Sequence, residues 1–259
     1  MLRVAGVSFD FSDQVVLITG GTKGVGRVLA ERFAAAGAAV IVCARSTGRG
    51  DVAPLPDTWT FIAADLRDGE QAWGMVDAAV AVHGRLDVVV NNAGGSPPAD
   101  TSTATPRFTE RIVALNLLAP IYVSQRANHH MQLGAGGSIV NIGSVTATRP
   151  APTSAAYGAA KAGLANFTMT AGQEWAPKVR VNAITAGPIL TELAMQHYGD
   201  AEQFARVQRT VPMGRLASPE DVADTCLYLA SPAAAFVTGA NVLLHGGGDR
   251  PAFLDALDG

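Results

Sequence analysis

Cysteine and histidine are scarce in this chain. Its 259 residues include two cysteines and five histidines, too few and too scattered for a disulfide scaffold or a cluster of zinc ligands. Cys43 and Cys226 lie among apolar neighbours, so we expect buried free thiols, as in proteins of the reducing cytoplasm. His129 and His130 are adjacent, and adjacent side chains of a helix diverge, which indicates a surface rather than a metal site.

Charge and long apolar runs are scarce as well. Charged residues make up 16% of the chain, the formal net charge is −3, and no basic block is present. Nucleic acid is therefore not an expected partner. The first ten residues lack the apolar run of a signal peptide, and no stretch reaches the ~18 uninterrupted apolar residues of a membrane span. We expect a cytoplasmic protein without a membrane partner.

Short apolar strands alternate with helical segments along the whole chain, and 48% of the residues are apolar. This alternation predicts an α/β fold, a doubly wound sheet of seven parallel strands with helices on both faces. No internal repeat or linker is visible, so residues 1–259 are expected to form a single domain. The strands are expected at 15–19, 39–44, 59–63, 86–90, 138–142, 179–183 and 241–244, and the main helices at 26–36, 69–82, 108–132, 155–174 and 219–230.

Ser144, Tyr157 and Lys161 carry the strongest chemical signal. Tyr157 and Lys161 are four residues apart, which places both side chains on one face of a helix. An ammonium beside a phenol favours the phenolate, and at ~4 Å with an effective dielectric of ~20 the attraction is roughly 4 kcal/mol. We therefore expect a lowered pKa for Tyr157, suited to proton exchange near neutral pH. The alternative is a chance pair on a helix surface.

A glycine-rich turn follows the first of the seven strands. Residues 19–26 read Thr-Gly-Gly-Thr-Lys-Gly-Val-Gly, and a helix follows. Such a turn lets backbone N–H groups approach a pyrophosphate, and the helix N-terminus favours its negative charge. The glycines fall at 20, 24 and 26, which is not the G-x-G-x-x-G spacing. Tight packing of strand on helix would also explain a single turn of this kind.

Together these motifs resemble the short-chain dehydrogenase/reductases. The turn at 19–26, Asn-Asn-Ala-Gly at 91–94, Asn116, Ser144, Tyr157 and Lys161 occur in the order and spacing of that family. The resemblance runs from about residue 13 to 248, and it is closest to the compact branch that includes 3-oxoacyl-carrier-protein reductases and related ketone reductases. It implies a Rossmann-type fold and an oxidoreductase acting on CH–OH groups.

The resemblance assigns a role to each catalytic candidate. Tyr157 is expected to be the general acid in reduction and the base in oxidation. Lys161 is expected to hold the nicotinamide ribose and to bias Tyr157 toward phenolate, and Ser144 to bind the substrate oxygen. Asn116 is expected to hold a water that links Lys161 to solvent, with a satisfied core amide as the alternative. For Ser144 the alternative is a hydroxyl that bonds its own backbone.

NADP(H) is the expected cofactor. Ala44 stands where NAD-binding relatives carry an acidic residue, Arg45 follows it, and Lys23 lies in the glycine turn; a guanidinium binds a 2′-phosphate that a carboxylate would repel. The alternative is that both cations are solvated surface charges. Asp65 is expected to contact adenine, with a helix N-cap as its alternative. The full expected set is Gly20, Thr22, Lys23, Gly24, Val25, Gly26, Arg45, Ser46, Asp65, Leu66, Asn92, Ala93, Gly94, Tyr157, Lys161, Gly187, Ile189 and Thr191.

The sequence departs from the family pattern at two places. Ala186 occupies a slot that commonly holds proline, which predicts a less rigid turn, and His245 occupies a slot that often holds aspartate. We expect a structural rather than catalytic role for His245.

Residues 192–213 are expected to form an apolar lid, suited to a small apolar or acyl-type carbonyl substrate. The helices at 108–132 and 155–174 predict a homotetramer, or at least a homodimer. Two alternative functions stay open, a dinucleotide-binding protein without turnover and a sugar-nucleotide epimerase or dehydratase.

Overall fold

The computed structural model describes residues 1–4, 6–47, 53–191 and 200–251. Its centre is one seven-stranded sheet in the order β5-β4-β3-β6-β7-β8-β9, and every neighbouring pair is parallel. The strands are β3 (Val15–Thr19), β4 (Ala39–Ala44), β5 (Thr60–Ala63), β6 (Val88–Asn91), β7 (Gly137–Ile142), β8 (Val179–Ala186) and β9 (Asn241–Leu244). The predicted fold class is confirmed, with seven strands at the expected positions.

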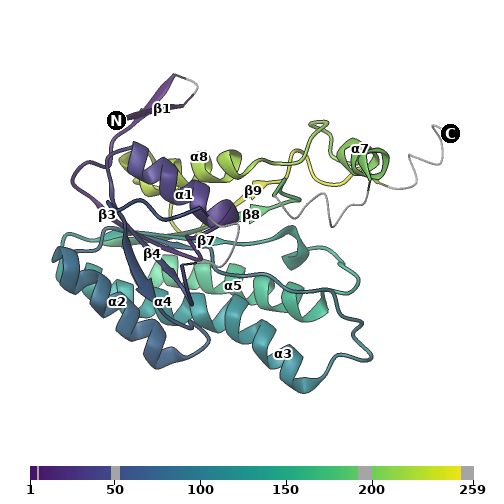
Figure 1. The fold of residues 1–259 in the computed structure, drawn as a ribbon, viewed down its shortest axis with the longest axis horizontal. Helices are drawn as coiled ribbons and strands as arrows, with labels where there is room; N and C mark the ends of the chain where they lie inside the picture. The colour runs from purple at the N-terminus through teal and green to yellow at the C-terminus, as the bar shows by residue number, and fades with distance from the viewer. Residues whose placement is uncertain (5, 48–52, 192–199, 252–259) are drawn as a thin grey trace.

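Helices cover both faces of the sheet (Figure 1). The α-helices are α1 (Gly24–Ala35), α2 (Gly69–His83), α3 (Pro106–Val113), α4 (Ala119–Leu133), α5 (Ala155–Glu174), α7 (Ala201–Arg209) and α8 (Pro219–Ala230). Helices α1 and α8 lie on one face, and α2, α4 and α5 lie on the other, whereas α7 lies apart, beyond the ends of β8 and β9. Two short 3₁₀ turns are η2 (Val145–Ala147) and η3 (Pro232–Ala234).

Alternation along the buried strands supplies a core for each face. Ile18 of β3 packs with Phe33 of α1 and Leu227 of α8 on one face. Leu17, the next residue back along β3, packs with Met75 of α2 on the other face. Successive side chains of a strand point to opposite faces, so a continuous apolar run builds both layers at once.

Two local features depart from the sequence expectation. A two-stranded antiparallel hairpin, β1 (Leu2–Val4) with β2 (Val7–Phe9), precedes the sheet, with Gly6 at φ 88° in its turn. The helix expected at 108–132 is continuous in space, but residues Ala114–Leu118 (η1) form a π-helical turn between α3 and α4. A π turn holds an inserted residue within the helix and is frequent at functional sites.

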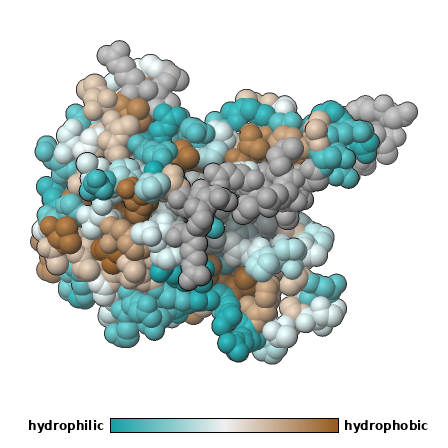
Figure 2. All heavy atoms as spheres, in the orientation of Figure 1, coloured by the Kyte–Doolittle hydropathy of each residue, from teal (hydrophilic) through white to brown (hydrophobic). Residues whose placement is uncertain are grey.

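The surface carries no long apolar stretch on the face that Figure 2 shows, where hydrophobic patches are small and lie among hydrophilic residues. Among the described residues, no helix combines the length and apolarity needed to cross a membrane. Within the same ranges, no three His, Cys, Asp or Glu side chains are grouped so that they could hold a metal ion.

The strand order determines where a ligand can bind. The chain leaves β3 to form β4 on one side, and β6 pairs with the other side of β3. At such a switch point the connections after neighbouring strands diverge and leave a crevice at the carboxyl ends. The glycine turn after β3 and the segment after β6 both lie at this crevice.

Candidate active site

A cleft of about 710 Å³ lies at the carboxyl ends of β3 to β6. Most of the expected cofactor residues line it, together with five that the sequence analysis did not assign. The lining residues are Gly20, Thr22, Lys23, Gly24, Val25, Gly26, Cys43, Ala44, Arg45, Ala64, Asp65, Leu66, Arg67, Asn92, Ala93, Gly94, Leu115 and Thr191. The structure thus gathers residues from four strand ends that are far apart in the sequence.

The glycine turn packs so closely against the segment after β6 that side chains are excluded. A Cβ on Gly26 would lie 2.2 Å from the carbonyl oxygen of Gly20 and 2.5 Å from Nδ2 of Asn92. Gly20 has φ 66°, and a Cβ there would lie 3.1 Å from Cα of Ala93. The turn therefore requires glycine at both positions, which keeps its backbone bare toward the cleft.

Thr19 and Asn92 fasten the turn to the neighbouring strand. Oγ1 of Thr19 accepts hydrogen bonds from the backbone N–H groups of Asn92 and Ala93, both at 3.0 Å. Nδ2 of Asn92 donates to the carbonyl oxygen of Thr19 at 3.0 Å. These bonds fix the position of the glycine turn relative to the segment after β6.

The N-terminus of α1 faces the cleft with its donors available. Lys23 is the N-cap residue and makes no side-chain capping bond, and the first turn of α1 has no acidic residue. The first N–H groups of a helix have no partner within the helix, so these groups suit phosphate oxygens. The bare glycine backbone and these donors fit the dinucleotide that the sequence predicts.

Among the described residues, three cations and one carboxylate lie at the adenosine end of the cleft. Lys23, Arg45, Asp65 and Arg67 all line it. Nε of Arg67 donates to Oδ1 of Asp65 at 2.8 Å, and a terminal nitrogen donates to Oδ2. This ion pair was not predicted from the sequence. The feature that could have indicated it is an acidic and a basic residue two positions apart, directly after a strand.

The N-cap alternative for Asp65 is wrong. The residue that caps α2 is Asp68, whose carboxylate accepts from the backbone N–H groups of Glu70 and Gln71. Asp65 instead holds Arg67, and its own N–H donates to Oε1 of Gln71 at 3.1 Å. Asp65 is therefore free of a helix-capping role.

Lys161 is buried at the inner end of the site. Its side chain is on α5, the residue is only 4% exposed, and Nζ donates to the carbonyl oxygen of Ile142 at 2.8 Å. Nζ also lies 5.7 Å from the ring centroid of Tyr157. Burial lowers the pKa of Lys161 from 10.5 to about 8, because a charged ammonium is disfavoured away from water.

The expected lowering of the pKa of Tyr157 is wrong for the protein as described. Burial raises the pKa of Tyr157, and a hydrogen bond with Ser144 lowers it by less. The ammonium of Lys161 lies 5.7 Å from the centre of the ring and donates to the carbonyl oxygen of Ile142. Desolvation by burial, which the four-residue spacing does not contain, therefore decides the direction of the shift.

Ser144 follows β7 and is the N-cap residue of η2, so its hydroxyl bonds nearby backbone as the alternative proposed. Oγ of Ser144 accepts from the backbone N–H of Thr146 at 3.3 Å and from Oγ1 of Thr146 at 3.0 Å. It also hydrogen-bonds the side chain of Tyr157. The hydroxyl is thus oriented by the first turn after the strand and directed at the phenol.

Asn116 lies in the π turn η1 and is fully buried. Its Oδ1 accepts from the N–H of Gly95 at 2.8 Å, and its Nδ2 donates to the carbonyl oxygens of Gly95 and Ile112 at 3.0 and 2.9 Å. The side chain is therefore a satisfied core amide, as the alternative proposed. Asn116 and Lys161 lie near each other, since both are close to Gly94. A Cβ on Gly94 would lie 2.8 Å from Oδ1 of Asn116 and 3.4 Å from Nζ of Lys161.

Five expected cofactor contacts lie outside the cleft lining: Tyr157 and Lys161, which were described above, and Ser46, Gly187 and Ile189. Ser46 is exposed after β4. Gly187 donates its N–H to the carbonyl oxygen of Leu244 at 2.9 Å, and Ile189 forms a parallel bridge with Ala217. Gly187 and Ile189 follow β8 and lead to Thr191, which does line the cleft.

The two departures from the family pattern have structural explanations. Ala186 continues β8 and pairs with Leu244 of β9, so the sheet ladder extends through the usual proline slot. His245 packs against Gly187, where a Cβ on Gly187 would lie 2.9 Å from Cβ of His245. These contacts fit a structural role for His245.

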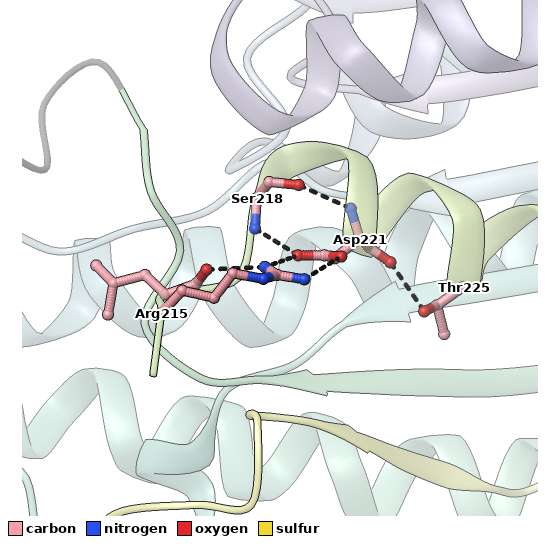
Figure 3. A network of polar contacts seen from close by, with 5 residues as sticks. Arg215, Ser218, Asp221 and Thr225 are labelled. Atoms are coloured by element: carbon pink, nitrogen blue, oxygen red, sulfur yellow. Dashed lines mark hydrogen bonds and ion pairs between the residues drawn. The ribbon is translucent and has the colours of Figure 1, made fainter. Parts of the chain in front are cut away.

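A polar network fastens the far end of the expected lid to α8 (Figure 3). Arg215 donates to both carboxylate oxygens of Asp221, and Asp221 accepts from the N–H of Ser218 at 2.7 Å. Ala217 bonds the other end of the lid, accepting from the N–H of Leu190 at 2.7 Å and donating to the carbonyl oxygen of Pro188 at 3.1 Å. Helix α7 lies within the lid, whereas residues 192–199 of the lid lie outside the described residues.

Comparisons with known proteins agree with this geometry. The family described as enoyl-(acyl carrier protein) reductase matches residues 20–248. An uncharacterized oxidoreductase of Mycobacterium tuberculosis is 35% identical over 92% of this chain and 93% of its own length. Cis-4-hydroxycyclohexanecarboxylate dehydrogenase of Sinomonas cyclohexanicum is also 35% identical, over 92% of this chain and 97% of its own. A solved short-chain type dehydrogenase/reductase of Mycobacterium ulcerans superposes with a TM-score of 0.84 and 31% identity, over 97% and 96% of the two chains.

Proposed function

This chain belongs to the short-chain dehydrogenase/reductase family, an oxidoreductase family acting on alcohols and ketones, and on that premise we propose that it transfers a hydride between NADP(H) and a ketone or its secondary alcohol. One observation supports this most strongly. Tyr157, Lys161 and Ser144 come together from α5 and the end of β7, beside a cleft whose bare glycine turn suits a dinucleotide.

The proposed chemistry divides between the cofactor and three side chains. The nicotinamide supplies the hydride in reduction and accepts it in oxidation. Tyr157 donates a proton from its hydroxyl to the carbonyl oxygen of the substrate in reduction. Ser144 donates a hydrogen bond to the same oxygen and stabilises its developing negative charge. Lys161 holds the ribose hydroxyls and supplies positive charge beneath the ring of Tyr157.

The protonated state of Tyr157 near neutral pH suits the proton donation that reduction requires. Burial raises its pKa above the usual value of 10, so the phenol keeps its proton and is available as an acid. Oxidation needs the phenolate, which becomes populated only as the pH approaches that raised pKa.

The cations at the adenosine end support the choice of NADP(H). Lys23 and Arg45 are exposed and line the cleft, and Ala44 leaves no carboxylate at the end of β4 to repel a 2′-phosphate. A guanidinium forms paired, charge-assisted hydrogen bonds with phosphate oxygens. NAD(H) offers only a ribose hydroxyl there and gains less from these charges.

We propose a small apolar or acyl-type carbonyl compound as the substrate. The apolar residues expected in the lid support this, although Leu193, Met195 and Tyr198 lie outside the described residues. Met213, which is described, is 69% exposed and lines a second cleft of about 250 Å³ beside His245. One of the similar proteins, from Sinomonas, is named for a hydroxylated ring carboxylate.

Turnover of NADPH against a panel of ketones tests the proposal. Tyr157→Phe removes the proton donor but keeps the ring, so kcat should fall by roughly 10²–10⁴ while NADPH affinity is retained. Tyr228→Phe is the matched control, because Tyr228 lies on α8 and is 41% exposed, and it should leave kcat unchanged. Near-normal turnover by Tyr157→Phe would disprove the assigned acid, and cofactor binding without turnover on any ketone would favour the non-catalytic alternative.

A further inference from the structure

Asp65 carries a carboxylate into a cleft that is otherwise suited to phosphate. Of the described residues that line the cleft, Asp65 alone is acidic. Its side chain is 30% exposed, so it is close to whatever occupies the adenosine end. An uncompensated anion at this place would repel a 2′-phosphate in the same way as a carboxylate at the end of β4.

Arg67 donates hydrogen bonds to both oxygens of this carboxylate. Nε and one terminal nitrogen of Arg67 donate to the two oxygens of Asp65, and the backbone N–H of Arg67 donates to Oδ1 at 3.2 Å. Paired guanidinium–carboxylate bonds of this kind fix both groups in one plane. The bond from Arg67 is the largest cause that holds the pKa of Asp65 below its usual range, and Arg45 adds to it.

We propose that Arg67 masks the charge of Asp65 and thereby sets the preference for a 2′-phosphorylated cofactor. With Arg67 in place, Asp65 and Arg67 together carry no net charge, and Lys23 and Arg45 remain as two cations that pair with no carboxylate of the described residues. Without Arg67, the carboxylate of Asp65 would cancel one of them. This inference rests on the proposed use of NADP(H), and it makes Arg67 a positioning residue that acts through Asp65.

The chain offers a matched control with the same chemistry elsewhere. Arg85 and Asp87 also lie two residues apart, and Arg85 donates to both oxygens of Asp87 through Nε at 2.9 Å and a terminal nitrogen at 2.7 Å. This second pair precedes β6, at the amino end of the sheet, and does not line the cleft. Arg85→Gln therefore removes a comparable ion pair without changing the charge of the cofactor site.

Calorimetric titration with two cofactor fragments measures the preference without turnover. The probes are adenosine 2′,5′-bisphosphate and adenosine 5′-monophosphate, compared as a ratio of affinities at fixed ionic strength. Arg67→Gln should lower the ratio by about tenfold, the size of one uncompensated charge near a phosphate. Asp65→Asn should keep or raise the ratio, and the double variant Asp65→Asn with Arg67→Gln should return it to within about threefold of the wild type.

The outcomes separate this inference from the proposed function. An unchanged ratio in Arg67→Gln overturns the masking role, and so does a double variant as weak as Arg67→Gln, because Arg67 would then contact the phosphate itself. A wild-type protein that binds both probes equally overturns the NADP(H) assignment together with this inference. Arg85→Gln should leave the ratio unchanged, and a loss there as large as in Arg67→Gln also overturns the proposal. Because a general loss of folding lowers both affinities without altering their ratio, the ratio is read only for variants whose affinity for adenosine 5′-monophosphate stays within about threefold of the wild type.

Discussion

Replacing Lys161 by methionine should stabilise the protein while it abolishes activity. The ammonium of Lys161 is 4% exposed and has one hydrogen bond within the described residues, to the carbonyl oxygen of Ile142 at 2.8 Å. Methionine keeps much of the length of the apolar stem and removes the buried charge. The substitution also leaves the carbonyl of Ile142 without this donor, which costs about 1–2 kcal/mol.

The magnitude and its dependence on pH follow from the pKa of Lys161. Burial lowers it from 10.5 to about 8, a difference that corresponds to about 3 kcal/mol at pH values below both. Between these two values the unfolded chain keeps a proton that the folded protein has released, so the free energy of unfolding of the wild type rises with pH. The net advantage of Lys161→Met should be about 1–2 kcal/mol near neutral pH and should shrink through that window.

Urea unfolding followed by circular dichroism at neutral and at alkaline pH measures this gap. Lys178→Met is the control, because Lys178 is exposed and its Nζ donates to the carbonyl oxygens of Gln132 and Gly134. That variant should show no gain at either pH. The reasoning is refuted if Lys161→Met is less stable than the wild type at neutral pH, or if its advantage does not shrink as the pH rises.

Three further predictions concern the glycine turn, the cofactor and assembly. Gly26→Ala should lower the free energy of unfolding by about 1–3 kcal/mol and weaken NADPH binding, since its Cβ would lie 2.2 Å from the carbonyl oxygen of Gly20. Gly74→Ala, in open space on α2, should instead raise the free energy of unfolding by about 0.5–1 kcal/mol. Equal unfolding curves for the two variants would contradict the packing argument. Arg45→Asp should erase the preference for NADPH over NADH, a change of about 1.5–3 kcal/mol, which fluorescence titration measures; a preference that survives would show that Arg45 does not contact the phosphate. Sedimentation should give a tetramer or dimer, since Phe236 and Leu243 are 103% and 60% exposed, and a 26.6 kDa species at micromolar concentration would refute assembly.

Several strands and helices could be predicted closely because their signals are local. The strand at 39–44 and the helices at 155–174 and 219–230 have the bounds that the sequence predicts. At the last helix, Ser218 and Asp221 form a capping box and proline follows the cap, which fixes where the helix begins. The hairpin β1–β2 was missed because its strands are three residues long and carry little periodicity.

The sequence predicts which residues form the site, but it does not predict the direction in which their pKa values shift. The spacing of Tyr157 and Lys161 predicts their proximity, and the structure has it, yet the direction of the Tyr157 pKa depends on burial, which spacing alone does not contain. The π turn at Asn116 likewise depends on tertiary contacts with Gly95. Arg67 was overlooked because a charged residue two positions after Asp65 resembles an ordinary surface residue until the cleft brings the two together.

The fastening of the two ends of the expected lid has a consequence for the segment between them. Leu190 and Ala217 are joined by a 2.7 Å hydrogen bond, and Arg215 is anchored to Asp221 of α8. Because the rest of the protein already holds both ends together, a longer replacement insert costs little in loop-closure entropy, about 0.6 kcal/mol for each doubling of its length. We therefore expect that the segment between Leu190 and Ala217 can be replaced by the corresponding segment of a relative with another substrate, without disturbing the cofactor cleft.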